Sequence, residues 1–503
     1  MVIIMEFLDP EEKRARTRRL FAAYGLIVFV IVAGTFILSF ALQGVDLFSR
    51  QTELRNGLLF VDSKPVSAQI NINGDTSKRT GARFVLPEGN YNIQLTENGY
   101  RPWQKDVVVQ GGKVVYHVYP KLIPTNITNT KGYVFGNTPQ IYTQSPDKRY
   151  IVATSSAGPS QFITIDTDAP TVTPLPWALP VELWNAQEAT TQRLEPVEWS
   201  TDNKHLLLAK IAQNGTKQYL MVNKDKPAES INLTAQLKLN SSDIVNLRDK
   251  KHDQFYVLDT TTKTLRKATI AEGLDQTAVA QNVISFAPYA NDTILYAIDQ
   301  GAELNQYAVR LLHGNNTYAL QPVTRSDTIL LDIARFQNDW YIVAGSTPQE
   351  LTTVYINPFD GNNQPIPADK ALSIEPLKPQ LLIPLAGARY VSFSENARFI
   401  GLQSADAFSV YDAELKQVYS YKSPVLLPAT GATWMDGHRY SVVTGGNEVI
   451  FEYDGQNMQT LAPAIDNTAA YFDKDYNNLF TLVSGADDKT FQQINSLVYK
   501  PTN

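Results

Sequence analysis

The sequence predicts a mainly β protein with one N-terminal transmembrane helix. Three observations predict it. The 23 residues from Leu20 to Leu42 include no charged side chain. Apolar and polar residues alternate over residues 57–123, and from Tyr133 onward a polar turn followed by an apolar strand returns eight times. We therefore expect the helix to be followed by a small antiparallel β-sandwich and then by a seven- or eight-bladed β-propeller.

The charge-free run is long enough to cross a bilayer. At ~1.5 Å per residue it spans about 35 Å, against a hydrocarbon core of ~30 Å. Five basic residues precede it: Lys13, Arg14, Arg16, Arg18 and Arg19. Basic flanks resist translocation, so we expect residues 1–19 in the cytoplasm, residues 20–42 as a single-pass anchor in the cell membrane, and the domains beyond the connector 43–56 outside.

A cleaved signal peptide is the alternative to an anchor. Ser39 and Ala41 are small residues at the −3 and −1 positions that a signal peptidase requires. The apolar part of a signal peptide is typically ~7–15 residues long, however, and this run is longer. We therefore favour an uncleaved tether.

Composition excludes several kinds of chemistry and partner. The chain contains no cysteine, which excludes disulfides, thiolate metal sites and cysteine nucleophiles, and an exported chain of this size without disulfides is typical of bacteria. The net charge is −6 and no block of Lys and Arg follows residue 19, so we expect no nucleic-acid partner. The 25 Tyr and 21 Phe residues favour strands.

Residues 57–123 carry turn signals at the spacing of short hairpins. Asn73-Gly74, the segment Pro87 to Asn90, and Gly111-Gly112 separate runs of alternating apolar and polar residues. Glycine and asparagine supply the positive φ angles that such turns need. We expect about six short strands in a two-layer sandwich.

This span resembles a PEGA domain. The matching elements are Asn73-Gly74, the run from Leu86 to Tyr91 and the run from Gly99 to Trp103, in the right order and spacing. Thr80-Gly81 stands where the family commonly has Thr-Pro, which we expect to change one turn only. The resemblance implies a small surface-exposed module of a bacterial or archaeal envelope protein, without known catalytic residues.

Residues 124–503 contain the repeat. Its eight units begin at Ser145, Ser200, Arg248, Ala287, Arg335, Ser394, Met435 and Asp473. They follow one another at 38 to 59 residues, close to the ~40–50 residues of a four-stranded propeller blade. The third and fifth units are the weakest, which leaves seven blades open. We expect the Asp in each turn to cap local backbone N–H groups.

The repeated unit resembles the TolB-type, WD-repeat-like β-propeller unit. In that unit an aromatic residue precedes Ser-Pro-Asp-Gly-Lys, and an apolar strand follows. The closest copies are Ser145 to Tyr150 and Trp199 to Lys204, and the later ones are degenerate. The resemblance supports a propeller and implies no particular ligand.

Two proline-rich insertions interrupt the repeats, at 168–195 and 358–384. Trp177 and Trp184 in the first are our candidates for partner contact, because paired Trp residues on a loop are a common contact device. The alternative is that they cover an edge of the propeller. Tyr100 and Trp103 are candidates of the same kind, with packing at one end of the sandwich as the alternative.

No motif of catalysis, cofactor binding or metal binding stands out. The five histidines, at positions 117, 205, 252, 313 and 438, form no HExxH, HxH or i, i+4 pair. We expect His205, His252 and His438 at the surface, and no metal at Asp147 or Asp202, because these residues belong to separate blades. Nucleophile-elbow, P-loop and dinucleotide motifs do not occur in the sequence.

These observations predict a membrane-anchored, extracytoplasmic, non-catalytic protein of the bacterial cell envelope. Its propeller would present loops to a protein, peptide or cell-wall glycan partner, without a cofactor. The alternative is a surface hydrolase or lyase with an active site in the propeller funnel, assembled from loops that lie far apart in the sequence.

Overall fold

The computed structural model describes residues 24, 26–32, 35, 56–127, 129–135, 138–169, 174–184, 193–300, 303–359, 365, 375–484 and 491–495. Of the predicted anchor it describes residues 24, 26–32 and 35, all helical, and the rest of the anchor lies outside the described residues. Among the residues that it describes, no helix is both long enough and apolar enough to cross a membrane. The anchor therefore stays a prediction.

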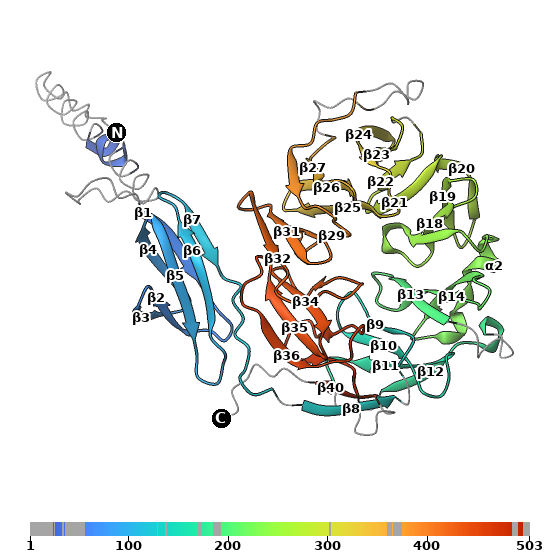
Figure 1. The fold of residues 1–503 in the computed structure, drawn as a ribbon, viewed down its shortest axis with the longest axis horizontal. Helices are drawn as coiled ribbons and strands as arrows, with labels where there is room; N and C mark the ends of the chain where they lie inside the picture. Colours follow the sequence, from blue (N-terminus) through green and yellow to red (C-terminus); the bar gives the residue numbers. More distant parts are fainter. Residues whose placement is uncertain are drawn as a thin grey trace, which may run out of the picture. The chain divides into compact units, whose positions relative to one another are not determined.

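The chain divides into two compact units, Met1–Asn126 and Ile127–Asn503. The first contains seven strands in two sheets, ordered β4-β1-β7 and β3-β2-β5-β6 (Figure 1). The strands are β1 (Asn56–Val61), β2 (Gln69–Ile72), β3 (Asp75–Arg79), β4 (Ala82–Pro87), β5 (Gly89–Thr96), β6 (Trp103–Val109) and β7 (Val114–His117).

The alternation predicted for this unit decides which side chains fill it. Every second residue of β1 and β6 is buried, because successive side chains of a strand point to opposite faces. Leu59, Ile93 and Val109 are fully buried. The first unit is thus a β-sandwich with a thin apolar core between its sheets. It departs from the predicted all-antiparallel arrangement at one place, because β1 pairs with β7 in parallel.

The second unit contains seven four-stranded antiparallel sheets, each built from four consecutive strands. The first four are β9 (Tyr142–Gln144), β10 (Tyr150–Thr154), β11 (Gln161–Asp166) and β12 (Leu175–Ala178); β13 (Arg193–Trp199), β14 (His205–Ile211), β15 (Lys217–Asn223) and β16 (Ile231–Asn232); β17 (Ile244–Leu247), β18 (Gln254–Asp259), β19 (Thr264–Thr269) and β20 (Gly273–Ala280); β21 (Val283–Tyr289), β22 (Thr293–Ile298), β23 (Gln306–His313) and β24 (Asn316–Thr324).

The remaining three are β25 (Ile329–Phe336), β26 (Asp339–Ser346), β27 (Leu351–Ile356) and β28 (Leu381–Pro384); β29 (Tyr390–Phe393), β30 (Phe399–Gln403), β31 (Ala407–Asp412) and β32 (Gln417–Lys422); β33 (Thr433–Trp434), β34 (Arg439–Thr444), β35 (Asn447–Glu452) and β36 (Gln459–Pro463). Short helices lie between strands: η1 (Val181–Leu183), η3 (Pro227–Glu229), α2 (Leu233–Leu237) and η4 (Arg248–Lys250).

The sheets follow one another around a central axis, with the first strand of each sheet innermost (Figure 1). This arrangement is a β-propeller. Apolar clusters fill the spaces between neighbouring sheets, as between β10 and β14, where Val152, Leu206 and Leu208 pack together.

The ring is completed by strands from both ends of the second unit. β37 (Tyr471–Phe472) pairs with β38 (Leu479–Phe480), and β39 (Val483–Ser484) with β40 (Phe491–Asn495). The outer strand is β8 (Asn129–Phe135), which pairs antiparallel with β40. The first seven predicted units, the weak third and fifth included, each supply one four-stranded sheet. The eighth supplies the strands of two small sheets, β37-β38 and β39-β40-β8, the second of which includes β8 from the start of the unit.

The predicted polar turns all join the first and second strand of a sheet, and we call them inner turns. Ser145 shows why they form: its Oγ accepts the Tyr150 N–H at 2.9 Å, while Asp147 Oδ1 accepts the Arg149 N–H at 3.1 Å. Lys148 between them has φ of 62°. Asp202, Asp436 and Asp473 likewise accept backbone N–H groups of their own turns, which confirms the predicted capping.

Candidate functional site

The two Trp residues of the first insertion lie against the propeller. Trp177, on β12, is half-buried, stacks on Phe162 with ring centroids 4.4 Å apart, and donates its Nε1–H to Thr164 Oγ1 at 2.9 Å. Trp184 is only 5 % exposed and belongs to the apolar cluster between the first two sheets. Both positions agree with the packing alternative. The exposed part of Trp177 remains available for contact, so its role as a partner contact stays a prediction.

Tyr100 and Trp103 are also buried, at 8 % and 4 % exposure. The Trp103 ring lies 6.3 Å from that of His117 and 6.4 Å from that of Tyr119, measured between centroids. Tyr100 forms an isolated bridge with Pro124. Both side chains pack inside the sandwich, as the second of our two interpretations has it.

The inner turns of the propeller converge at one end of its axis. Lys148 Nζ, from the first sheet, lies 3.0 Å from Glu395 Oε2 in the sixth and 3.2 Å from the Met435 carbonyl oxygen in the seventh. Tyr476, in the last inner turn, hydrogen bonds to both Lys148 and Glu395. We call Lys148, Glu395 and Tyr476 the axial cluster. It joins turns that are hundreds of residues apart in the sequence.

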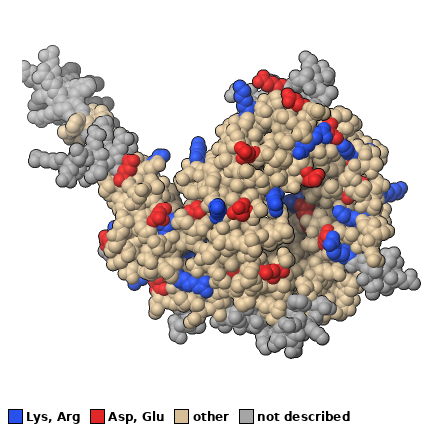
Figure 2. All heavy atoms as spheres, in the orientation of Figure 1, with Lys and Arg blue, Asp and Glu red and all other residues tan. Residues whose placement is uncertain are grey.

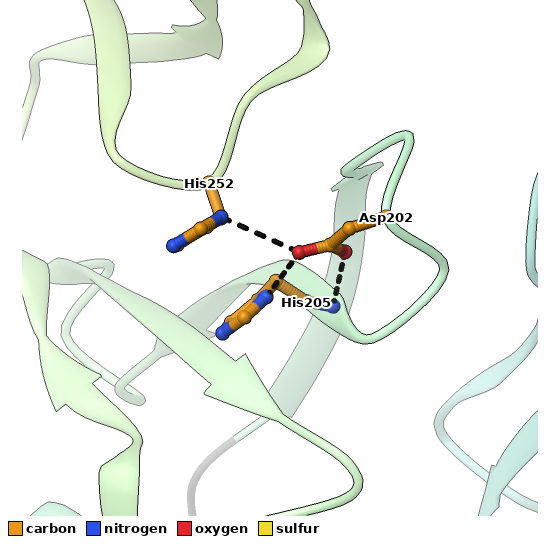
Figure 3. Close-up of side chains that lie close together, drawn as sticks. All are labelled: Asp202, His205 and His252. Carbon is orange, nitrogen blue, oxygen red and sulfur yellow. Dashed lines mark hydrogen bonds and ion pairs between the residues drawn. The ribbon is translucent and has the colours of Figure 1, made fainter.

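A second polar cluster lies where the inner turns of the second and third sheets meet. It consists of Asp202, His205 and His252 (Figure 3). Asp202 Oδ2 lies 2.6 Å from His205 Nδ1 and 3.3 Å from His252 Nδ1. The two imidazole rings stack, with centroids 3.9 Å apart and planes 10° from parallel. One carboxylate oxygen thus faces two imidazole nitrogens.

Asp202 is fixed in this position by its own turn. Its Oδ1 accepts the N–H groups of Lys204 at 2.9 Å and His205 at 3.0 Å, which leaves Oδ2 for the imidazoles. Partial burial acts to raise the pKa of Asp202, but these backbone hydrogen bonds and the contact with His205 outweigh it and hold the pKa at about 2. The carboxylate is therefore ionised at neutral pH.

The turns that carry the cluster are bound to each other. The Thr201 N–H donates to the Lys250 carbonyl at 2.9 Å, and the Leu247 N–H donates to Glu198 Oε2 at 2.7 Å. Lys250 also forms an ion pair with Glu198. His252 follows directly on this junction. The side chains of His205, Asp202 and His252 are 17 %, 31 % and 42 % exposed. The contacts between the two turns thus fix the cluster, and part of it is open to solvent.

The structure corrects our reason for expecting no metal here. We expected residues of separate blades to lie apart, but neighbouring inner turns touch: Asn203 Oδ1 accepts the Asp147 N–H at 3.1 Å, and His252 reaches Asp202. A signal was present in the sequence, since His205 and His252 occupy similar positions in consecutive repeat units. Equivalent positions of adjacent blades are neighbours on the ring.

His438 lies apart from this cluster, on the inner turn of the seventh sheet. Burial lowers its pKa to about 3, the nearby Asp436 acting against the shift. His438 is thus neutral at physiological pH. Its partly buried position differs from the surface position that we expected.

A cavity of about 540 Å³ lies where the seventh, eighth and first sheets meet. Its lining runs from the inner-turn residues Ser145 and Lys148 to the loop residues Pro428 and Thr430. In Figure 2 a hollow near the middle of the propeller has acidic and basic side chains around it.

Glu448, on β35, is an ionisable residue in the wall of this cavity that the sequence analysis did not single out. It is fully buried, and its Oε1 accepts the Ser441 hydroxyl at 2.6 Å. Its Oε2 has no hydrogen-bond partner among the described residues. Burial raises the pKa of Glu448 to about 8, the Ser441 hydrogen bond opposing the shift. Glu448 is therefore mostly protonated at neutral pH.

Comparisons with known proteins agree with this architecture. Residues 56–126 match the family model of the PEGA domain, which confirms the resemblance found in the sequence. The chain is thus a mainly β protein in which a PEGA domain precedes a β-propeller. No curated protein matches the chain in a sequence search.

Solved structures similar to the chain include the following three. The Myceliophteria thermophila Cps50 (Swd1) β-propeller domain is 11 % identical, covers 67 % of this chain and 99 % of its own, and has a TM-score of 0.37. The C-terminal WD40 domain of Sif2 is 12 % identical, covers 82 % of this chain and 97 % of its own, and has a TM-score of 0.35. The dihydro-heme d1 dehydrogenase NirN in complex with DHE is 12 % identical, covers 64 % of this chain and 66 % of its own, and has a TM-score of 0.39. At such distances the sheet topology itself, and not these matches, defines the fold.

Proposed function

We propose that the chain is a membrane-tethered, extracytoplasmic binding protein without catalytic activity. The charge-free run Leu20 to Leu42 would tether it, the PEGA domain would act as a spacer or wall contact, and the propeller would bind a protein, peptide or envelope-glycan partner. The observation that carries this proposal is the fusion of these three parts in one chain.

The rigidity of the ring supports a binding role for its loops. Antiparallel connectivity puts the connection between second and third strands, and the connection between sheets, at the end of the ring opposite the inner turns. Leu304, between β22 and β23, is fully exposed, and Leu426, between β32 and β33, is 83 % exposed. Binding residues often lie on loops that a rigid scaffold positions, and these two leucines provide apolar contact area there. We place the partner on this loop end.

Photo-crosslinking in cells tests this placement. A photoreactive amino acid replaces Leu304 or Leu426, and, as a matched control on an exposed inner-turn residue, Lys251. We expect the two loop positions to capture the same envelope component and the control to capture none. Capture from Lys251 alone would move the partner to the inner-turn end, and no capture from any of the three would refute the binding role.

Enzymatic activity is the competing function, and it predicts turnover. The purified full chain is screened on peptidoglycan, polysaccharide and peptide substrates, and we expect no turnover. Asp332, on the innermost strand β25, is the variant to compare, because burial raises its pKa to about 7, a value suited to acid–base chemistry. Turnover that Asp332→Asn abolishes would overturn the non-catalytic proposal.

The tether has a separate test. Protease added to intact spheroplasts should degrade the propeller and the PEGA domain and spare a fragment that contains the first ~45 residues, since basic flanks keep the N-terminus inside. Protection of the propeller in intact cells would reverse the proposed orientation.

A further inference from the structure

We propose that Asp202, His205 and His252 bind one divalent transition-metal ion of the zinc type. This goes beyond the binding role of the propeller, because it assigns a site to the inner-turn end of the ring. Two imidazole nitrogens and one carboxylate oxygen are a donor set that Zn²⁺ takes in proteins, whereas Ca²⁺ and Mg²⁺ prefer oxygen donors only.

The distances between the donor atoms are close to those of a bound site. With metal–ligand bonds of about 2.0–2.1 Å, a tetrahedral ion holds its ligand atoms ~3.3 Å apart. Asp202 Oδ2 and His252 Nδ1 already have this separation, at 3.3 Å. Asp202 Oδ2 and His205 Nδ1 are 2.6 Å apart, a hydrogen bond that lengthens by about 0.7 Å when the metal replaces the shared proton.

The imidazole rings must also turn, because each nitrogen lone pair lies in the plane of its ring. The rings are now nearly parallel and stacked, so they must splay for both Nδ1 atoms to point at one ion. His252 has the freedom to do this, with 42 % of its side chain exposed on the loop before β18. Asp202 stays in place, since its Oδ1 accepts two backbone N–H groups of the turn, and the His205 ring turns about its side-chain bonds to lengthen its contact with Oδ2.

Asp202 is already held in position before a metal binds, and this preorganisation favours binding. The ionised Asp202 supplies the negative charge, with Oδ1 anchored by two backbone N–H groups and Oδ2 turned to the histidines. The junction of Thr201 with Lys250 fixes the spacing of the two turns. Three protein ligands with solvent on the fourth side make an open site of the kind that binds a further ligand. The axial cluster is a contrast, because Lys148 already neutralises Glu395 there.

The test is metal binding by the purified full chain in detergent, stripped with chelator and titrated with Zn²⁺ by calorimetry. Co²⁺ serves as a second probe, since its visible absorption reports the coordination geometry. We expect one equivalent of Zn²⁺ to bind, and His252→Ala to weaken binding about 10- to 100-fold or more, because even outer-shell changes have effects of that size. The proposal predicts the same loss for Asp202→Asn.

The variants are chosen so that a folding defect is not mistaken for a lost ligand. Asp202→Asn keeps an Oδ1 acceptor for the turn, and His252 is exposed and caps no backbone group in the structure described. His313→Ala is the matched control, a histidine that stacks on Phe359 away from the cluster. Unchanged affinity in both site variants, or equal loss in the control, would overturn the assignment, as would no Zn²⁺ uptake by a parent chain with a native circular-dichroism spectrum.

Discussion

Replacing the buried carboxylic acid of Glu448 by an amide should make the propeller more stable at alkaline pH. Glu448→Gln keeps the shape of the side chain and an oxygen that accepts the Ser441 hydroxyl. It removes the ionisation. In the parent protein the folded state holds the proton, because burial raises the pKa of Glu448 to about 8, while the unfolded chain releases it near the ordinary value of 4.5.

The size and sign of the effect follow from that difference in pKa. A raised folded-state pKa contributes stability that is complete below pH 4.5 and is lost as the pH rises to about 8. At 1.36 kcal/mol for each pKa unit, the full loss is roughly 4–5 kcal/mol, and more than half of it has occurred at pH 7. Glu448→Gln has no ionisable group at this position and does not lose this stability. The free energy of unfolding of the variant should therefore equal that of the parent near pH 4.5 and exceed it most above pH 8.

Denaturant unfolding of parent and variant at a series of pH values measures this advantage, with the propeller followed by its tryptophan fluorescence. The difference between the two curves cancels the titration of other groups. Infrared difference spectroscopy of the protonated carboxyl band gives the pKa of Glu448 directly. Ser441→Ala is the control, and it should shift the pH range upward, because the Ser441 hydrogen bond favours the charged form. Parallel pH profiles for parent and variant, or a carboxyl band that titrates near pH 4.5, would refute the reasoning.

Three further predictions concern the stability of the ring, each measured by denaturant unfolding. Arg398→Met should destabilise the propeller by about 3–5 kcal/mol, because Arg398 pairs in bidentate fashion with the fully buried Asp412, at 2.6 and 3.0 Å, and its loss leaves that buried charge without its partner. Adding Asp412→Asn removes the charge and keeps the Oδ1 that accepts the Glu414 and Leu415 N–H groups, so it should restore part of the loss; no rescue would contradict this account. Gly401→Ala should lower stability by about 1–3 kcal/mol, because the new Cβ would clash with Tyr440 Oη; Tyr440→Phe should relieve the clash. Trp184→Ala should lower stability by about 3–5 kcal/mol as a core residue does, and unchanged stability would return Trp184 to the partner-contact interpretation.

The repeated turns could be predicted from the sequence because they are local. The serine and aspartate side chains accept backbone N–H groups within a few residues of themselves, as in the turn of Ser145 and Asp147. Even a degenerate copy of the turn therefore predicts the first two strands of a sheet. Ring closure could not be predicted in this way. β8 and β40 pair only because the ring brings the two ends of the unit together, and nothing in either short segment specifies the other.

The site residues also differ in whether their contacts are local in the sequence. Asp202 and His205 are three positions apart in one turn, but the approach of His252 depends on how adjacent sheets pack. The burial of Glu448 likewise depends on how the sheets of the ring pack together. A single glutamate in the apolar segment Glu448 to Phe451 gives a weak signal of it. For the Trp residues of the insertion, the position on a loop suggested that the side chains are exposed. In the structure Trp184 is buried, because it packs into the apolar cluster between the first two sheets.

The pairing of β8 with β40 has a consequence for the timing of assembly. β8 is the first strand of the propeller to be synthesised and β40 the last of those described, so the ring stays open until the whole unit has emerged. Pairing between such distant segments is slow, and unpaired strand edges are exposed meanwhile. A chain released before residue 491 would leave β8 without its partner strand, and such truncated products should be captured by chaperones or degraded.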